Sequence, residues 1–318
     1  METLKVLFLA ANWRVSLVRA FQDAKAQCET PFQLIAVDSD PLAPALQVAD
    51  RSHSLPLFSD SICLELLLTI CRTQVIDAII PLTNKAIDFL NTHREELSGG
   101  NRRLFIQESS TIEICHDKWN LWKFMELEGF NSPKTFLLTE SDPPDIFPLI
   151  AKERNGEGGK NQSIIEDQRD LDHCMDKYPH HIYQELIQGR EFSVDLFADI
   201  KGTPQLVVPR ERLSVRGGEV MMSRIDMNES IIDSVEALSR RLALTGPCTL
   251  QGILNENGTF LFTDLNLRFG SGSVHTIAAG GNIPLMIYQE MAGQSFFEPS
   301  IQNQSIMTRY PESIFHHS

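Results

Sequence analysis

Short apolar runs alternate with segments of helical spacing through the first 106 residues, and this alternation limits the fold more than any other feature. The first run, Lys5 to Ala10, is almost continuously apolar, as in a strand buried on both faces. Such runs separated by helices predict an open parallel sheet with helices on both faces. The expected strands are residues 5–10, 32–37, 78–81 and 103–106, and the expected helices are residues 15–26, 64–72 and 85–96.

The turn after the first strand bears on what this sheet could bind. Residues 10–14 read Ala-Ala-Asn-Trp-Arg and lack the GxGxxG pattern that brings a dinucleotide close to the backbone. Asp38, after the second strand, occupies the place where a dinucleotide-binding domain holds the ribose. Without the glycines we expect Asp38 to have a structural or substrate-side role.

From Ser110 onward the pattern becomes a mixture of helices and antiparallel strands. The expected strands are residues 148–152, 163–165, 181–186, 191–199 and 205–208, and the main expected helices are residues 119–128, 170–177, 231–242 and 284–291. Asn303 to Ser318 is polar and is expected to form a loosely held tail. The predicted fold class is therefore α/β followed by α+β.

A hairpin is predicted in the C-terminal third, with residues 255–258 in its turn. Pairing of Leu254 with Thr259 would put Gln251 opposite Phe262 and diagonal to Asp264. A slip of one residue would turn Gln251 to the other face, so the cluster described next depends on this register.

Alternation along the second strand of the hairpin places Asp264 and Asn266 on one face beside Gln251, with Arg268 further along. One carboxylate and two amide oxygens suit Mg²⁺ that carries nucleotide phosphates, or Mn²⁺ in its place. Arg268 could then meet those phosphates or an anionic intermediate. A hairpin with an ordinary polar outer face is the alternative.

A lysine precedes a glycine-rich loop in the middle of the chain. Lys152 lies near the end of a predicted strand, and Gly156, Gly158 and Gly159 follow it. Backbone amides of such a loop can close on phosphate oxygens while the lysine neutralises their charge. Because turns collect glycine for conformational reasons, an ordinary hairpin loop is the alternative.

A second strand end has the features of a nucleotide contact. Gln184, Glu185, Leu186 and Ile187 end a predicted strand and lead to Glu191. Extended backbone there could pair with a purine edge, with the two apolar side chains at the ring and Glu191 accepting from ribose hydroxyls.

Three arginines follow the strand at residues 205–208. Arg210, Arg212 and Arg216 precede a pair of glycines, and a guanidinium in such a segment could hold a carboxylate with two hydrogen bonds. Arg210 and Arg216 are the candidates for that role. A solvated basic loop is the alternative.

Composition excludes several classes of protein. The 318 residues carry a formal net charge of −14, which argues against a protein that mainly holds a nucleic-acid backbone. No segment approaches the roughly 20 apolar residues that span a bilayer, and the N-terminus does not read as a signal peptide. Six cysteines without CxxC spacing indicate free thiols, so a cytoplasmic location is expected, with no nucleic-acid or membrane partner.

Lys118, Lys152 with its glycine loop, the segment 184–187, Glu191 and the Gln251, Asp264, Asn266 cluster follow the order of the ATP-grasp superfamily. The chain resembles its carbamoyl-phosphate-synthase-like branch over roughly residues 1–295. The resemblance implies a pre-ATP-grasp domain at 1–110, an ATP-grasp domain at 111–300 and a tail at 301–318. The ATP-grasp domain would divide into a small subdomain, 111–182, and a large one, 183–300.

The resemblance also implies roles. Lys118 and Lys152 would contact the α- and β-phosphates, residues 184–187 would hold adenine, and Glu191 would hold ribose. Gln251, Asp264 and Asn266 match metal positions, and Arg268 matches an arginine that supports the transferred phosphoryl group. Two departures stand out, because Asp264 replaces the usual glutamate and Leu267 the usual proline.

The function expected from these features is ATP-dependent ligation of a small carboxylate to an amine through an acyl phosphate. An ATP-binding protein with weak or no catalysis is the main alternative, suggested by the two departures. A dinucleotide-dependent oxidoreductase is a third, which the missing glycines disfavour. The identities of acid and amine are open, and so is a homodimer.

Overall fold

The fold was determined as a computed structural model that describes residues 3–139, 144–156 and 161–315. Its first part is a parallel sheet with the strand order β3-β2-β1-β4-β5. The strands are β1 (Leu4–Leu9), β2 (Phe32–Asp38), β3 (Arg51–Ser54), β4 (Ala78–Pro81) and β5 (Arg103–Leu104). The parallel sheet predicted from the alternating runs is therefore confirmed.

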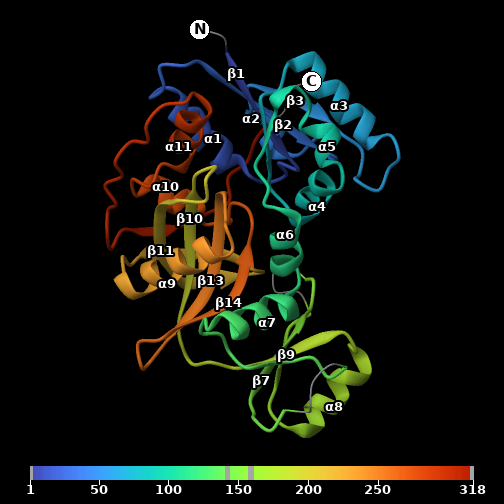
Figure 1. Cartoon of the computed structure of the whole chain (residues 1–318), viewed down its shortest axis with the longest axis vertical. Coiled ribbons are helices and arrows are strands. Elements are labelled where there is room, and N and C mark those ends of the chain that lie inside the picture. Colours follow the sequence, from blue (N-terminus) through green and yellow to red (C-terminus); the bar gives the residue numbers. More distant parts are fainter. Residues whose placement is uncertain (1–2, 140–143, 157–160, 316–318) are drawn as a thin grey trace.

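Helices cover both faces of this sheet (Figure 1). Val6 and Phe8 face one side and pack with α1 and α2, whereas Leu7 and Leu9 face the other and pack with α3 and α4. The helices are α1 (Val15–Lys25), α2 (Pro44–Val48), α3 (Cys63–Gln74), α4 (Asn84–Thr92), α5 (Arg94–Leu97), a 3-10 turn at Gly99–Asn101, α6 (Ser109–His116) and α7 (Lys118–Glu128).

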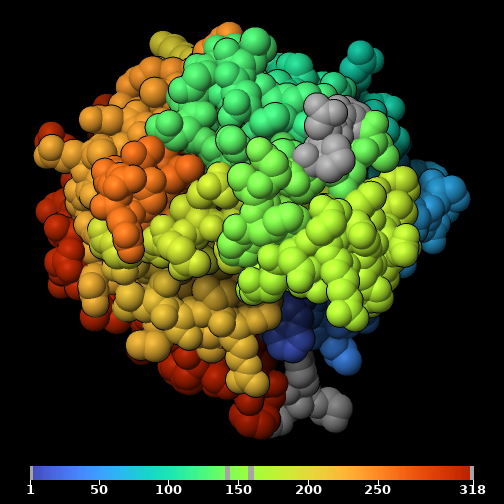
Figure 2. All heavy atoms as spheres, turned by 90° about the horizontal axis from the view of Figure 1, so that it is seen from below, coloured from blue at the N-terminus to red at the C-terminus, as the bar shows by residue number. Residues whose placement is uncertain are grey.

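A four-stranded antiparallel sheet of order β6-β9-β7-β8 forms a small lobe with its own core around Leu149 and Tyr183. Its elements are β6 (Thr135–Phe136), β7 (Leu149–Glu153), β8 (Ser163–Ile165), α8 (Gln168–Lys177) and β9 (His181–Glu185). In Figure 2 this yellow-green lobe lies in front of the molecule, beside the gold and orange of the next sheet.

The third sheet has the order β14-β13-β10-β11-β12-β15 and is antiparallel throughout. Its elements and adjoining helices are β10 (Gly189–Ala198), β11 (Pro204–Arg216), β12 (Glu219–Ile225), α9 (Glu229–Arg241), β13 (Gly246–Asn255), β14 (Phe260–Asn266), α10 (Ser273–Ala278), α11 (Ile283–Met291) and β15 (Ile306–Thr308). Helix α9 packs on one face, while α10 and α11 contact α1 of the first domain. The first domain and the large sheet therefore share both of their hydrophobic cores.

Three expectations are corrected. The arginine segment 209–216 is not a loop, because it continues β11 and pairs with β12. The tail is not loosely held where β15 pairs with β12 and extends the sheet. In the C-terminal hairpin, Leu254 pairs with Phe260 and not with Thr259, so the predicted register is wrong by one residue at the turn.

All six cysteines lie in the described part of the chain and are free thiols. Within residues 3–139, 144–156 and 161–315, no helix has the length and apolar content needed to cross a membrane.

Candidate active site

One face of the six-stranded sheet carries a polar strip across four strands. Residues directly opposite each other in an antiparallel ladder point to the same face. The ladder pairs Arg210 with Ser193, Ser193 with Gln251, and Gln251 with Asp264. The sequence positions of this strip are far apart, and only the register brings them into line.

A β-bulge in β14 brings Asp264 beside Gln251. Pairing steps from Gly252–Phe262 to Gln251–Asp264, which leaves Thr263 as the extra residue. The bulge reverses the alternation, so Phe262 is buried on the far face while Thr263 and Asp264 both line the polar side. Gln251 is therefore directly opposite Asp264, closer than the diagonal placement that the sequence predicted.

The oxygen set formed by Gln251, Asp264 and Asn266 fits a magnesium ion that arrives with phosphates. In the described part of the chain, no group of three or more His, Cys, Asp or Glu side chains could hold a metal by itself. A Mg²⁺ ion here would need oxygens from phosphate and water to complete its shell, as is usual when it accompanies a nucleotide.

Two lysines lie next to this oxygen set. Lys118, the first residue of α7, has its Nζ 3.9 Å from Asp264 Oδ1 and donates to the carbonyl of Gly156 at 2.6 Å. Lys152 in β7 donates to Oε1 of Gln184 at 2.6 Å. Burial lowers the pKa of Lys152 to about 8; Lys118 pushes it the same way, while Asp264 and Glu191 oppose the shift. Lys118 thus approaches Asp264 directly, and the charge of Asp264 also acts on Lys152.

The segment 184–187 joins the small lobe to the large sheet. The Gln184 amide is already engaged by Lys152 and by Thr135, to which it donates at 3.0 Å. The backbone N–H of Leu186 donates to Pro148 at 3.2 Å, and that of Glu185 donates to Lys134 at 2.8 Å. These residues organise the junction, and their contact with adenine stays a prediction, as does that of Ile187.

Glu191 and Arg212 face each other next to the oxygen set. Arg212 Nη1 lies 3.2 Å from Glu191 Oε2 and donates to Gln251 Oε1 at 3.4 Å. The sequence analysis named Arg210 and Arg216, and not Arg212, as candidates to hold a carboxylate. Alternation along a strand nevertheless puts Arg212 on the same face as Arg210. The structure places Arg212 in the lining of the site, next to Gln251 of the oxygen set.

Arg268 is held between the large sheet and the first domain. Its Nε donates to Oδ1 of Asn84, at the start of α4, at 3.1 Å, and Nη1 donates to the carbonyl of Phe269 at 3.2 Å. The first domain therefore helps to orient the arginine that the sequence analysis placed beside the transferred phosphoryl group.

Arg210 is fully buried and is not a lining residue of the site. Its Nε lies 2.7 Å from Asp195 Oδ2, and Asp195 also accepts hydrogen bonds from Thr249, Ser273 and Thr276. Burial would raise the pKa of Asp195, but the ion pair with Arg210 and these hydrogen bonds outweigh it and lower the pKa.

The Asp195–Arg210 pair lies directly under the turn that follows Arg268. A Cβ atom on Gly272 would lie 2.3 Å from Arg210 Nη1, so this turn needs a residue without a side chain. Thr249, bonded to Asp195, also accepts from the N–H of Gly270 at 2.8 Å. The expectation that Arg210 clamps substrate is therefore corrected, because its guanidinium supports the turn from below.

Arg216 also lies outside the site. The β11–β12 ladder changes register twice between Arg212 and Val215, which reverses the alternation of β11. Val215 consequently lines the site, whereas Arg216 is exposed and pairs with Glu219 across the turn. Gly158 and Gly159 lie outside the described residues.

The oxygen set, the two lysines, Glu191, Arg212 and Arg268 line one cavity of about 1720 Å³, bounded by the first domain, the large sheet and the C-terminal segment. Its described lining has seven cationic side chains and four carboxylates, although the whole chain has a net charge of −14. The surplus of positive charge favours an anionic ligand. The cations are Arg14, Arg19, Lys118, Lys152, Arg212, Arg268 and Arg309, and the carboxylates are Glu191, Glu219, Asp264 and Glu312.

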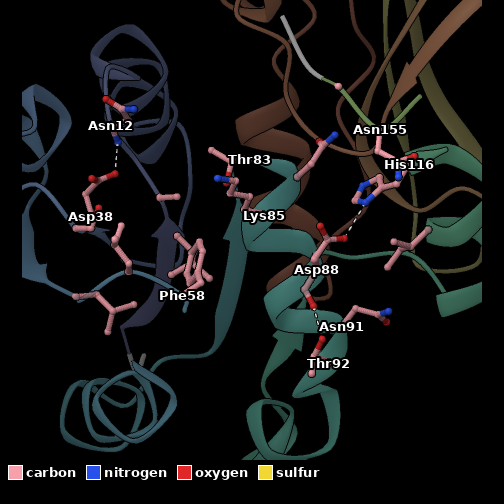
Figure 3. Close-up of a pocket in the computed structure, with 18 of the residues that line it drawn as sticks. Asn12, Asp38, Phe58, Thr83, Lys85, Asp88, Asn91, Thr92, His116 and Asn155 are labelled. Atoms are coloured by element: carbon pink, nitrogen blue, oxygen red, sulfur yellow. Dashed lines mark hydrogen bonds and ion pairs between the residues drawn. The ribbon is translucent and has the colours of Figure 1, made fainter. Parts of the chain in front are cut away.

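A second cavity lies at the carboxyl edge of the parallel sheet (Figure 3). Asp88 from α4 and His116 from α6 meet across it at 2.8 Å. Asp38 accepts from the backbone N–H groups of Asn12 at 2.8 Å and Asp40 at 3.1 Å. Both Asp38 oxygens thus hold the loops in place, which gives no support to a ribose contact.

Two family matches together cover most of the chain. Residues 6–101 match the PylC-like N-terminal domain, and residues 115–272 match the ATP-grasp domain. The chain is an ATP-grasp protein with a PylC-like N-terminal domain. Proteins with the ATP-grasp fold are typically ADP-forming ligases that use ATP to activate a carboxylate.

This ATP-grasp protein is a distant homologue of carbamoyl-phosphate synthase. The synthase of Methanobrevibacter smithii is 21% identical over 234 residues, which are 71% of this chain and 58% of the relative. The chain thus spans less than two thirds of the relative's length.

Two solved structures are similar to nearly the whole chain. An N5-carboxyaminoimidazole synthetase from Staphylococcus aureus, complexed with ADP, has a TM-score of 0.75 at 15% identity, covering 96% of this chain and 82% of its own. An L-amino acid ligase from Bacillus licheniformis has a TM-score of 0.71 at 19% identity, covering 95% and 75%. At such identities the likeness establishes the fold.

Proposed function

We propose that this protein is an ATP-dependent ligase that activates a small carboxylate as an acyl phosphate and transfers the acyl group to an amine. The observation that carries the proposal is the meeting of Lys118, Lys152, Asp264, Arg212 and Arg268 around one cavity. An L-amino acid ligase among the similar structures supports carboxylate–amine ligation as the reaction class.

In this proposal the chain's residues act mainly by placing charge. Lys118 and Lys152 would neutralise the nucleotide phosphates, and Gln251, Asp264 and Asn266 would hold the ion. Mg²⁺, when bound, would offset the negative charge that develops on the phosphate oxygens.

The substrate carboxylate would attack the γ-phosphoryl group in line, with ADP as the leaving group. Arg268 and Arg212 would stabilise the transferred phosphoryl group and hold the acid. The amine would then attack the acyl carbon, phosphate would leave with one of the original carboxylate oxygens, and the amine would lose a proton.

A specific observation also supports an ATP-binding protein with weak catalysis. Asp264 is shorter than the glutamate usual at this position, and one of its oxygens already accepts from the N–H of Leu265 at 3.0 Å. A short carboxylate engaged in this way is less suited to bridge two ions.

A measurement of ADP release distinguishes the ligase from the ATP-binding protein. The protein is incubated with Mg-ATP and pooled amino acids and other small carboxylic acids. The ligase proposal expects ADP and phosphate to form only when an acid is present. Asp264→Ala should lower the turnover on the order of 100-fold at saturating Mg²⁺. Tight ATP binding without acid-dependent turnover would favour the binding protein, and unchanged turnover in Asp264→Ala would refute the metal assignment.

A further inference from the structure

Large apolar side chains are exposed at the mouth of the cationic cavity. Trp13 is 79% exposed, Tyr310 is 76% exposed and Leu42 is 68% exposed, and all three line that cavity. Pro311 and Ile314 also line it. Apolar groups gathered at the mouth of a binding cavity commonly contact an apolar part of the ligand.

The two aromatic residues come from opposite ends of the chain but are anchored on the same turn. Arg14, next to Trp13, donates to the carbonyl of Phe269 at 3.2 Å. Arg309, next to Tyr310, donates to the carbonyl of Ser271. Because this turn directly follows Arg268, the arginines next to Trp13 and Tyr310 tie both backbone segments to the reacting end of the proposed site.

The C-terminal segment that carries Tyr310 is fixed on both sides of the ring. Strand β15 pairs with β12 before it, and Arg309 also lies 2.7 Å from Glu219. After it, Glu312 lies 2.7 Å from Arg19 of helix α1. The wall formed by this segment is therefore held against both the large sheet and the first domain.

We propose that the carboxylate substrate carries a bulky apolar or aromatic side chain, which packs on Trp13 and Tyr310 while its anionic group faces the cationic interior. This inference rests on the proposed ligase function, to which it adds the class of acid. The orientation follows from the cations at the oxygen set, since Lys118 and Arg212 would attract the anionic end and leave the apolar end for Trp13 and Tyr310.

Steady-state kinetics with phenylalanine and leucine, compared with glycine and alanine, test the preference. Trp13→Ala and Tyr310→Ala should each raise KM for the bulky acids on the order of ten-fold, because a lost aromatic contact weakens binding by about that factor. Their kcat values should change little, and the small acids should be almost unaffected. Phe315→Ala is the matched control, since Phe315 is 80% exposed but lies outside the described lining.

Fluorescence gives a readout that does not need turnover. The chain has three tryptophans, and Trp119 is 4% exposed and stacked on Trp122 with ring centroids 4.7 Å apart. Trp13 is the strongly exposed one, so phenylalanine or leucine should change its emission in the presence of Mg-ADP. Trp13→Phe should remove the change while keeping a ring at the mouth.

The outcomes separate this inference from the ligase function. A bulky acid that changes Trp13 emission without supporting ADP release upholds the apolar binding site at Trp13 and Tyr310 but removes the ligase function. Turnover confined to small polar acids, with KM unchanged in Trp13→Ala and Tyr310→Ala, overturns the inference but still supports the ligase function. If there is neither turnover nor an emission change, both the inference and the ligase function are overturned.

Discussion

At the scale of single residues, Lys152 makes the site sensitive to pH. Its pKa of about 8 means that the ammonium form, which attracts phosphate, is lost as the pH rises through 8. Bound phosphates favour the charged form, so ATP binding above pH 8 should take up a proton. The Kd for ATP should therefore rise between pH 7 and pH 9 in the native protein.

Calorimetry in buffers of different ionisation enthalpy measures that proton uptake. Lys152→Arg should remove the dependence, because arginine stays charged over this range. Lys152→Ala should weaken ATP binding roughly 10- to 100-fold, the usual loss for a hydrogen bond to a charged group. A pH-independent Kd in the native protein would contradict the assignment of Lys152 to phosphate.

Arg212 and Arg216 form a matched pair, four residues apart on one strand. Arg212 is 14% exposed and contacts Glu191 and Gln251 in the cavity, whereas Arg216 is exposed beyond the bulges. Arg212→Ala should lower kcat/KM for the acid by about 10-fold or more, as expected for loss of a charge-assisted contact. Arg216→Ala should stay near the native value, and a reversed order would show that the cavity assignment is wrong.

At the scale of elements, the buried Asp195–Arg210 pair supports β10, β11 and the turn 269–273 together. Arg210→Ala would leave a buried carboxylate without its partner, so the free energy of unfolding should fall by about 3–5 kcal/mol. In the native protein the pKa of Asp195 is lower in the folded than in the unfolded state. The ionised carboxylate therefore stabilises the fold at pH values above the unfolded-state pKa, and this stabilisation is lost as the pH falls through the folded-state pKa.

The variant should show the opposite dependence. Without Arg210, burial raises the pKa of Asp195, so stability should be greatest at low pH and decline as the pH rises through that value. Urea unfolding at pH 5 and pH 8 measures this reversed pH dependence of the free energy of unfolding. The double variant Asp195→Asn/Arg210→Met should show a smaller pH dependence than Arg210→Ala. An equal loss of stability at both pH values would contradict this description of the pair.

Elements with a clear apolar pattern could be predicted from the sequence, and those made by tertiary pairing could not. The apolar runs at β1, β2 and β4 fix the parallel sheet, because such runs must be buried. Strands β3 and β15 are mostly exposed and have no such pattern, and each forms by pairing with a neighbouring strand. Bulges leave no comparable signal, which is why the sequence put Gln251 diagonal to Asp264 and named Arg216 as a candidate to hold a carboxylate.

The same limit applies to the candidate site. Lys118, Lys152, Asp264 and their neighbours follow a recognisable order along the chain, so their meeting could be anticipated. The sequence could not show that Arg212, and not Arg210, lines the site. Both residues are on the same face of β11, and Arg210 is buried only because the turn packs over it.

At the scale of the whole molecule, the cavity joins three parts of the chain that the sequence keeps apart. The first domain supplies Arg14 to the lining and Asn84 as a hydrogen-bond partner of Arg268, the small lobe supplies Lys152, and the large sheet supplies the oxygen set. In the proposed function, carboxylate activation would need all three parts in place, because different elements would hold the nucleotide, the ion and the acid.

Transfer of ¹⁸O from a labelled carboxylic acid to phosphate tests the central claim most directly. The substrate would be a carboxylic acid that supports ADP release, labelled in both carboxyl oxygens and incubated with Mg-ATP and an amine. An acyl phosphate requires one carboxylate oxygen to leave with the phosphoryl group, so mass spectrometry should find one ¹⁸O atom in each phosphate released. ADP formation with unlabelled phosphate would contradict the account.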